Sequence, residues 1–139
     1  MSRILAIDFG LKRTGLAVTD SSRIIASALD TVPTSDVIDY LTKYTAKEKV
    51  DGFVIGLPMN LNGTPTNATQ HVHAFIAEMK KRFPQHWIET VDERFTSSMA
   101  QQTLNMSGLG KMARRDKGAL DRISATIILQ GWLERQRHG

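Results

Sequence analysis

The stretch that decides the fold is Ile4-Leu5-Ala6-Ile7-Asp8-Phe9-Gly10. It leads into Leu11-Lys12-Arg13-Thr14-Gly15 and then into a second apolar run, Leu16-Ala17-Val18. Asp8 thus lies within an apolar strand, and burying a carboxylate there costs several kcal/mol unless a cation or hydrogen bonds compensate. Asp8 is therefore a candidate for a metal site, a phosphate-handling site or proton transfer. The alternative is an ordinary hydrogen-bonded aspartate at a strand end.

The composition is that of a globular protein, with 41% hydrophobic and 23% charged residues among 139. This length predicts one domain, residues 1–139, that can bury a real core. The absence of cysteine excludes disulfides, thiolate metal sites and a cysteine nucleophile, and it suits a cytoplasmic protein. Asp8 interrupts the first apolar run too early for a signal peptide, and no run approaches the roughly 18 apolar residues of a membrane span, so no membrane partner is expected.

Positive charge is concentrated in two places, within a formal net charge of +4. The first hairpin contains Lys12 and Arg13, and a later segment contains Lys111, Arg114, Arg115 and Lys117. Clusters of this kind attract phosphates. The alternative for each cluster is a solvated basic loop.

The order of apolar and turn-forming segments predicts five strands and four helices. The expected strands cover 3–10, 15–19, 24–32, 53–57 and 87–91. The expected helices run from Thr34 or Ser35 to Lys47, over 67–83, over 96–106, and onward from Asp121, with a loop over 107–119 before the last one.

This order predicts an α/β fold with a five-stranded mixed sheet. The first three strands form an antiparallel meander, because short polar loops join them. The fourth and fifth strands run parallel to the first, which is central, in the order 3-2-1-4-5. Helices are expected on both faces.

Acidic residues stand at three places that such a sheet brings towards one edge: Asp8, the pair Asp92-Glu93, and Asp121. Oxygen ligands from separate elements suit Mg²⁺ or Mn²⁺, and two such ions can activate water and stabilise the leaving oxygen of a phosphodiester. The alternatives are a helix N-cap for Asp121 and a surface ion pair of Glu93 with Arg94.

Four motifs in sequence order resemble the YqgF family, also called RuvX-like, of bacterial pre-16S ribosomal RNA nucleases and Holliday-junction-resolvase homologues. They are Ile7 to Val18, Val54 to Asn60 with Gly63, Asp92 to Ser97, and Asp121 with Ser124-Ala125. The resemblance implies a ribonuclease H-like fold, which agrees with the element order above. It also implies a divalent-metal nuclease that processes the 5′ end of pre-16S rRNA, with branched DNA as another substrate. It also implies that Asp8, Glu93 and Asp121 are the catalytic, metal-binding acids.

One departure concerns the fourth strand, where junction resolvases of this fold usually carry their second acid. Here that strand ends Gly56-Leu57-Pro58. In the order 3-2-1-4-5 the fifth strand lies about 9–10 Å from the first. This gap favours the longer Glu93 over Asp92 as the ligand, and Asp92 stays open as an additional one.

The cations have expected supporting roles around these acids. Lys12, Arg13 and Arg94 are candidates for holding phosphates or for neutralising developing negative charge. The basic segment 111–117 is expected to cover a nucleic-acid backbone near Asp121.

Other functions remain open at this stage. A DNA-junction nuclease would use the same acids, and a ribosome-assembly factor could bind RNA through the basic segment without cleaving it. A nucleotide-binding module is a third possibility, because Asp-Phe-Gly before a Lys-Thr-Gly hairpin resembles the phosphate loop of actin-like ATPases. Those proteins need a second, comparable domain, for which 139 residues leave no room.

Overall fold

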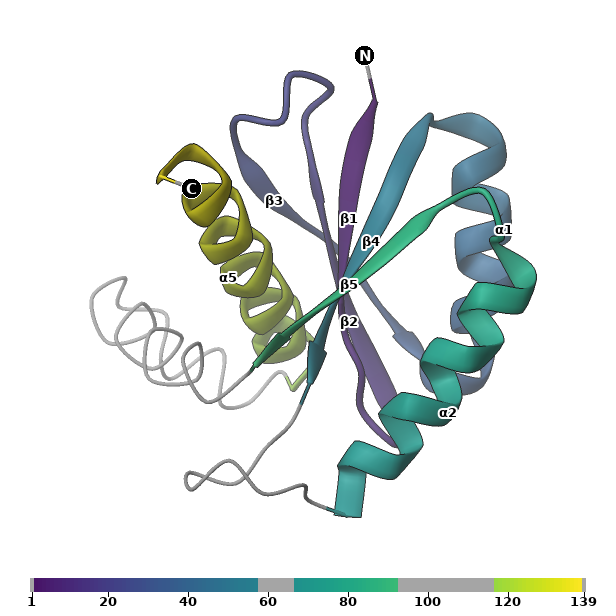
Figure 1. Cartoon of the computed structure of the whole chain (residues 1–139). Helices are drawn as coiled ribbons and strands as arrows, with labels where there is room; N and C mark the ends of the chain where they lie inside the picture. Colours follow the sequence, from purple (N-terminus) through teal and green to yellow (C-terminus); the bar gives the residue numbers. More distant parts are fainter. Residues whose placement is uncertain (1, 58–66, 93–116, 139) are drawn as a thin grey trace.

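The computed structural model describes residues 2–57, 67–92 and 117–138 (Figure 1). Five strands form one sheet in the order β3-β2-β1-β4-β5. They are β1 (Arg3–Asp8), β2 (Arg13–Thr19), β3 (Ala26–Pro33), β4 (Val50–Leu57) and β5 (Trp87–Asp92). β1 pairs antiparallel with β2 and parallel with β4, and β4 pairs parallel with β5. The predicted mixed sheet and strand order are confirmed.

Helices cover both faces of this sheet, as expected (Figure 1). The short 3-10 helix η1 (Thr34–Asp36) leads into α1 (Val37–Lys47), and α2 (Asn67–Arg82) lies beside it. α5 (Lys117–His138) covers the opposite face alone among the described helices. The sheet is therefore the middle layer of three.

Each face of the sheet has its own core, and the residues of β1 alternate between the two. Leu5 and Ile7 pack with α1 and α2, whereas Ile4 and Ala6 pack with α5. Because successive strand residues point to opposite faces, Asp8 follows Ile4 and Ala6 onto the α5 face. Asp8 therefore lies on the face of the sheet that α5 covers.

The start of the first helix differs from the expected one. η1 occupies Thr34–Asp36, and α1 starts after Asp36 with no side-chain hydrogen bond at its N-cap. The expected cap, Thr34, donates its hydroxyl to the carbonyl of Gly10 instead. The Thr34 side chain therefore bonds to the hairpin, whereas the sequence pattern had predicted that it would cap the helix.

The start of the last helix was also predicted wrongly. α5 begins at Lys117, four residues before Asp121, so Asp121 is not an N-cap. The last three residues of the loop expected over 107–119 belong to the helix. Gly118 suggested a break, but a single glycine costs a helix only about 1 kcal/mol. Burial of Ala125, Ile128 and Leu129 against the sheet exceeds that cost.

Two expected strands are shorter or shifted. β1 stops at Asp8, two residues before the expected end. β3 starts at Ala26, because the carboxylate of Asp20 accepts the backbone N–H groups of Ile24 and Ile25 and fixes a turn there. The expected helix over 96–106 lies outside the described residues. No helix of the described part is long and apolar enough to cross a membrane.

Candidate active site

The last residues of β1, β4 and β5 lie at one edge of the sheet. Asp8 ends β1, and Asp92 ends β5 directly opposite Leu57 at the end of β4. In open α/β sheets, sites form at the carboxyl ends of parallel strands. Figure 1 shows that α5 also starts at this end, near the arrowheads of β4 and β5. The backbone positions of Asp8, Asp92 and Asp121 therefore share one end of the molecule.

Glycines flank Asp8 on both neighbouring strands. Asp8 pairs with Gly15 of β2, and Gly56 of β4 follows the pair formed by Ile7 and Ile55. Gly56 in turn pairs with Val91 of β5. Since glycine has no side chain, the half-buried Asp8 carboxylate stands on the α5 face with bare backbone on either side. Neither flanking position therefore contributes a side chain beside this carboxylate.

α5 approaches the sheet closely next to this acid. Ala6, Ala17 and Ala125 are fully buried in one cluster, and small side chains let a helix and a sheet lie close together. Asp8 is two strand residues beyond Ala6, about 6.6 Å along β1. Asp121 is one helical turn before Ala125, about 6 Å along α5 in the same direction. Asp121 and Asp8 therefore both lie beyond this alanine cluster, towards the same end of the molecule.

The hairpin that follows Asp8 is tied to η1. The Thr34 hydroxyl donates to the Gly10 carbonyl at 2.6 Å, and the Thr34 N–H donates to the Lys12 carbonyl at 3.0 Å. An added Cβ at Gly10 would collide with the carbonyl of Arg13, so the turn requires glycine. Lys12 and Arg13 are exposed at the end of this braced hairpin. Both predicted cations thus lie at the same end of the sheet as Asp8.

Arg122 is a cation near this end that the sequence analysis did not identify. Its Nη1 donates to the Thr31 hydroxyl of β3 at 3.3 Å, and Thr31 pairs with Gly15, the neighbour of Asp8. The residue follows Asp121 directly, which is a weak signal by itself. Its relevance becomes visible only from the pairing of β2 with β3.

The remaining predicted site residues divide into two groups. Lys117 is the first residue of α5, so it is not in a loop, and Asp92 and Asp121 are placed by backbone only. Five predicted residues lie outside the described part of the chain: Glu93, Arg94, Lys111, Arg114 and Arg115. Among the described side chains, no group of three His, Asp or Glu residues could hold a metal ion. The metal ligands Asp8, Glu93 and Asp121 thus stay a prediction. Of these three, the structure describes the side chain of Asp8.

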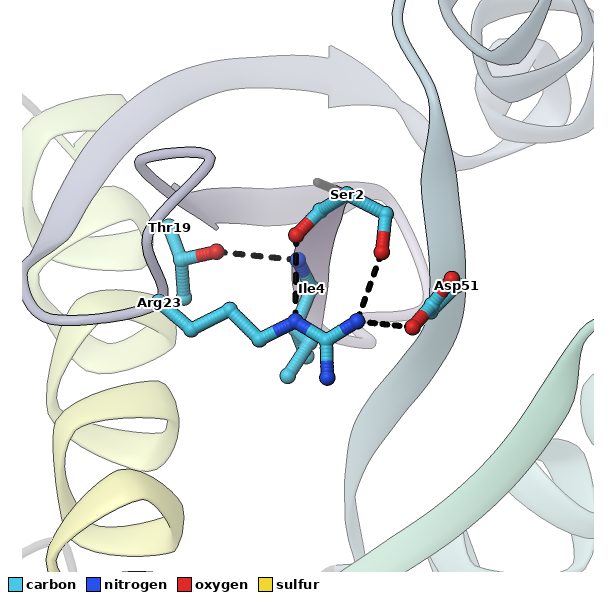
Figure 2. A network of polar contacts seen from close by, with 5 residues as sticks. All are labelled: Ser2, Ile4, Thr19, Arg23 and Asp51. Atoms are coloured by element: carbon cyan, nitrogen blue, oxygen red, sulfur yellow. Dashed lines mark hydrogen bonds and ion pairs between the residues drawn. The ribbon is translucent and has the colours of Figure 1, made fainter.

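A second polar cluster lies at the other end of β1 and is structural (Figure 2). Arg23 donates from Nε to the Ser2 carbonyl at 3.1 Å, donates from Nη2 to the Ser2 hydroxyl at 2.6 Å, and forms an ion pair with Asp51. The hydrogen bond from Ser2 and the charge of Arg23 lower the pKa of the Asp51 carboxyl. This network closes the amino ends of β1 and β4, away from the candidate site.

Comparison with known proteins agrees with this architecture. The sheet order and the helices on both faces define the ribonuclease H-like fold class. A solved structure described as T. thermophilus RuvC in complex with Holliday junction substrate shares the fold, with a TM-score of 0.55, 12% identity and 92% of each chain covered.

The chain belongs to the RuvX family, described as Holliday junction resolvase, which matches residues 2–135. Relatives with the name "Putative pre-16S rRNA nuclease" include one from Flavobacterium johnsoniae, 50% identical over 99% of both chains. Another, from Porphyromonas gingivalis, is 49% identical over 96% of this chain and 97% of its own. The predicted family and its nuclease class are confirmed.

Proposed function

We propose that this chain is a divalent-metal-dependent nuclease that hydrolyses phosphodiester bonds at the 5′ end of pre-16S rRNA. The observation that carries the proposal is the placement of Asp8. It ends the central strand on the α5 face, between two glycines and at the end of the sheet where α5 begins (Figure 1). The name shared by relatives at 50% and 49% identity supports the substrate.

Glu93 is the proposed partner of Asp8 and Asp121. Val91 of β5 is buried on the α5 face, the same face of the sheet as Asp8. Gly56 stands between β1 and β5 in the Asp8 row, so no β4 side chain fills the gap of about 9–10 Å. The longer acid is the better ligand across such a gap.

These carboxylates fit a divalent ion by their chemistry. Hard cations such as Mg²⁺ and Mn²⁺ prefer carboxylate oxygens, and the absence of cysteine excludes thiolate ligands. Asp8, Glu93 and Asp121 would hold the metal, with Asp92 as a possible addition. When bound, the metal supplies an activated water and stabilises the leaving oxygen.

The cations of the chain would position the substrate. Lys12 and Arg13, on the braced hairpin, bind phosphates of the nucleic acid next to the acids. Arg94 neutralises developing negative charge near Glu93. The basic residues Lys111, Arg114, Arg115 and Lys117 cover the backbone further along. We also propose that the chain acts as one domain in the bacterial cytoplasm, where ribosomal precursors are processed.

The test is cleavage of a pre-16S RNA with its 5′ extension by wild type and Asp8→Asn. Asparagine keeps the shape but removes the charge, so cleavage in Mg²⁺ or Mn²⁺ should be abolished while the circular dichroism spectrum is unchanged. Asp39→Asn, an exposed acid on α1, is the matched control and should cleave normally. Full activity of Asp8→Asn would refute the assignment.

A four-way DNA junction is the second candidate substrate, because the matching family is described as Holliday junction resolvase. Both substrates offer a phosphate backbone, so the acids alone do not separate them. Cleavage of the DNA junction and of the precursor RNA, measured side by side under identical conditions, distinguishes the two substrates. Metal-independent RNA binding with no cleavage of either substrate would instead indicate an assembly factor.

A further inference from the structure

Two arginines approach the bare stretch of sheet on the β3 side of Asp8. Across the α5 face run Thr31 of β3, Gly15 of β2 and Asp8 of β1, each paired with the next. Arg122 reaches this row from above, with its Nη1 3.3 Å from the Thr31 hydroxyl. The row from Thr31 to Asp8 spans two strand spacings, about 9–10 Å.

Arg13 of β2 belongs to the same face of the sheet as this row. Ala17 of β2 packs against α5, so strand alternation places Gly15 and Arg13 on that face too. Arg13 pairs with Pro33, and Thr31 pairs with Gly15, so Arg13 and Thr31 are diagonal neighbours on adjacent strands. Such neighbours lie about 7–8 Å apart, within reach of long side chains.

We propose that Arg122 and Arg13 form a phosphate subsite over Gly15, which holds a backbone phosphate of the nucleic acid beside the one attacked at Asp8. The subsite rests on the proposed nuclease function. Guanidinium groups present N–H donors in a fork that matches phosphate oxygens. The Thr31 hydroxyl accepts from the Arg122 guanidinium, and Gly15 contributes no side chain to the row between Thr31 and Asp8.

A phosphate offers the charge and the oxygen acceptors that guanidinium groups on one sheet face can bind together, which is the physical reason for this assignment. The competing explanation is structural: Arg122 would only tie α5 to the edge strand β3. The two explanations differ in one measurable quantity. A phosphate contact contributes to the salt dependence of nucleic-acid binding, with a slope of about 0.7 per contact for single strands, whereas a structural tie does not.

The experiment measures RNA affinity against KCl concentration by fluorescence anisotropy, with Asp8→Asn as the parent so that no cleavage occurs. Arg122→Gln and Arg13→Gln should each weaken binding of the 5′-extended RNA about tenfold and lower the salt slope by about 0.7. Arg135→Gln is the matched control. Arg135 is exposed on the same helix, 13 residues on and about 20 Å away, and its loss should change neither quantity.

Arg122→Lys keeps the charge and loses the fork, so it should keep the salt slope while affinity falls several-fold. It also tests the subsite if Arg122→Gln does not fold. A lower melting temperature with affinity and slope equal to those of Arg135→Gln would overturn the subsite. If the Asp8→Asn parent still cleaves RNA in Mg²⁺ or Mn²⁺, the proposed function fails, and slopes measured in EDTA, where no divalent metal supports cleavage, still decide the subsite.

Discussion

The Oγ1 hydroxyl of Thr34 donates a 2.6 Å hydrogen bond to the carbonyl oxygen of Gly10. The Thr14 and Thr34 hydroxyl oxygens are 2.9 Å apart. Since the Thr34 hydroxyl donates its single proton to the Gly10 carbonyl, the Thr14 hydroxyl must be the donor of this second bond. One hydroxyl thus joins β2, η1 and the hairpin that displays Lys12 and Arg13.

Replacing Thr34 with valine should therefore loosen the hairpin. Thr34→Val keeps the shape but removes an acceptor from the buried Thr14 and a donor from Gly10, at a cost of about 1–3 kcal/mol of unfolding free energy. RNA affinity should fall several-fold. Urea unfolding and anisotropy measure the two effects. Thr42→Val, which removes an exposed hydroxyl bonded to Ile38 within α1, should change neither.

Glu93 and Asp92 should differ sharply as ligands. Glu93→Gln is expected to reduce metal-dependent cleavage about 100-fold or more, because it removes a charge that would hold the metal. Asp92→Asn should keep most of the activity, since the shorter acid is the poorer ligand across the gap of about 9–10 Å between β1 and β5. Single-turnover cleavage at several Mn²⁺ concentrations gives the comparison. An inactive Asp92→Asn with an active Glu93→Gln would reverse the assignment.

His86 should make stability depend on pH. Its ring lies 5.2 Å from Phe53 and 5.6 Å from Phe83, and its Nδ1 is buried with no partner among the described residues. Desolvation is the main cause that lowers the pKa of His86. The folded state therefore favours the neutral ring, and the unfolded state takes up a proton near pH 6.5.

Stability that His86 supports is thus complete above about pH 6.5 and is lost as the pH falls from there through the lowered pKa. Urea midpoints at pH 7.5 and 5.0 should differ less for His86→Phe than for wild type. His73→Phe, at an exposed position, should keep the wild-type difference. Equal pH dependence in His86→Phe and wild type would contradict the prediction.

Arg23 is held in a left-handed backbone conformation, with φ of 60°. This conformation costs a non-glycine residue about 1 kcal/mol or more. Arg23→Ala and Arg23→Gly both lose the bonds to Ser2 and Asp51, but only glycine also relieves the backbone. The glycine variant should be about 1 kcal/mol more stable than the alanine variant in urea unfolding. Equal stability would show that the backbone is not strained there.

The sheet order could be predicted because local signals agreed with the final packing. The apolar run before Asp8 and the short polar turns indicated a meander, and β4 was recognisable as an apolar run between a helix and a proline. The candidate acid Asp8 followed from the same pattern. The apolar runs, the short turns and the position of Asp8 are all local patterns, so they can be recognised from neighbouring residues in the sequence.

Arg122 could not be found in this way, because its position depends on the pairing of β2 with β3. That register shifts between Leu16 and Ala17. Without the shift, Gly15 would face Asp30, and an acid would stand in place of Thr31. No residue pattern in either strand indicates the irregularity. The start of α5 was missed for a related reason: long-range burial outweighed the local signal of Gly118.

The two tryptophans of the chain, Trp87 and Trp132, stack with ring centroids 5.4 Å apart. Gly52 has no side chain that would collide with the Trp87 ring. Trp132 donates its indole N–H to the Glu89 carboxylate at 2.6 Å. All intrinsic tryptophan emission therefore originates at the seam between β5 and α5. A change in that emission on adding RNA or Mn²⁺ would report, without any attached dye, whether the helix that carries Asp121 shifts on its sheet.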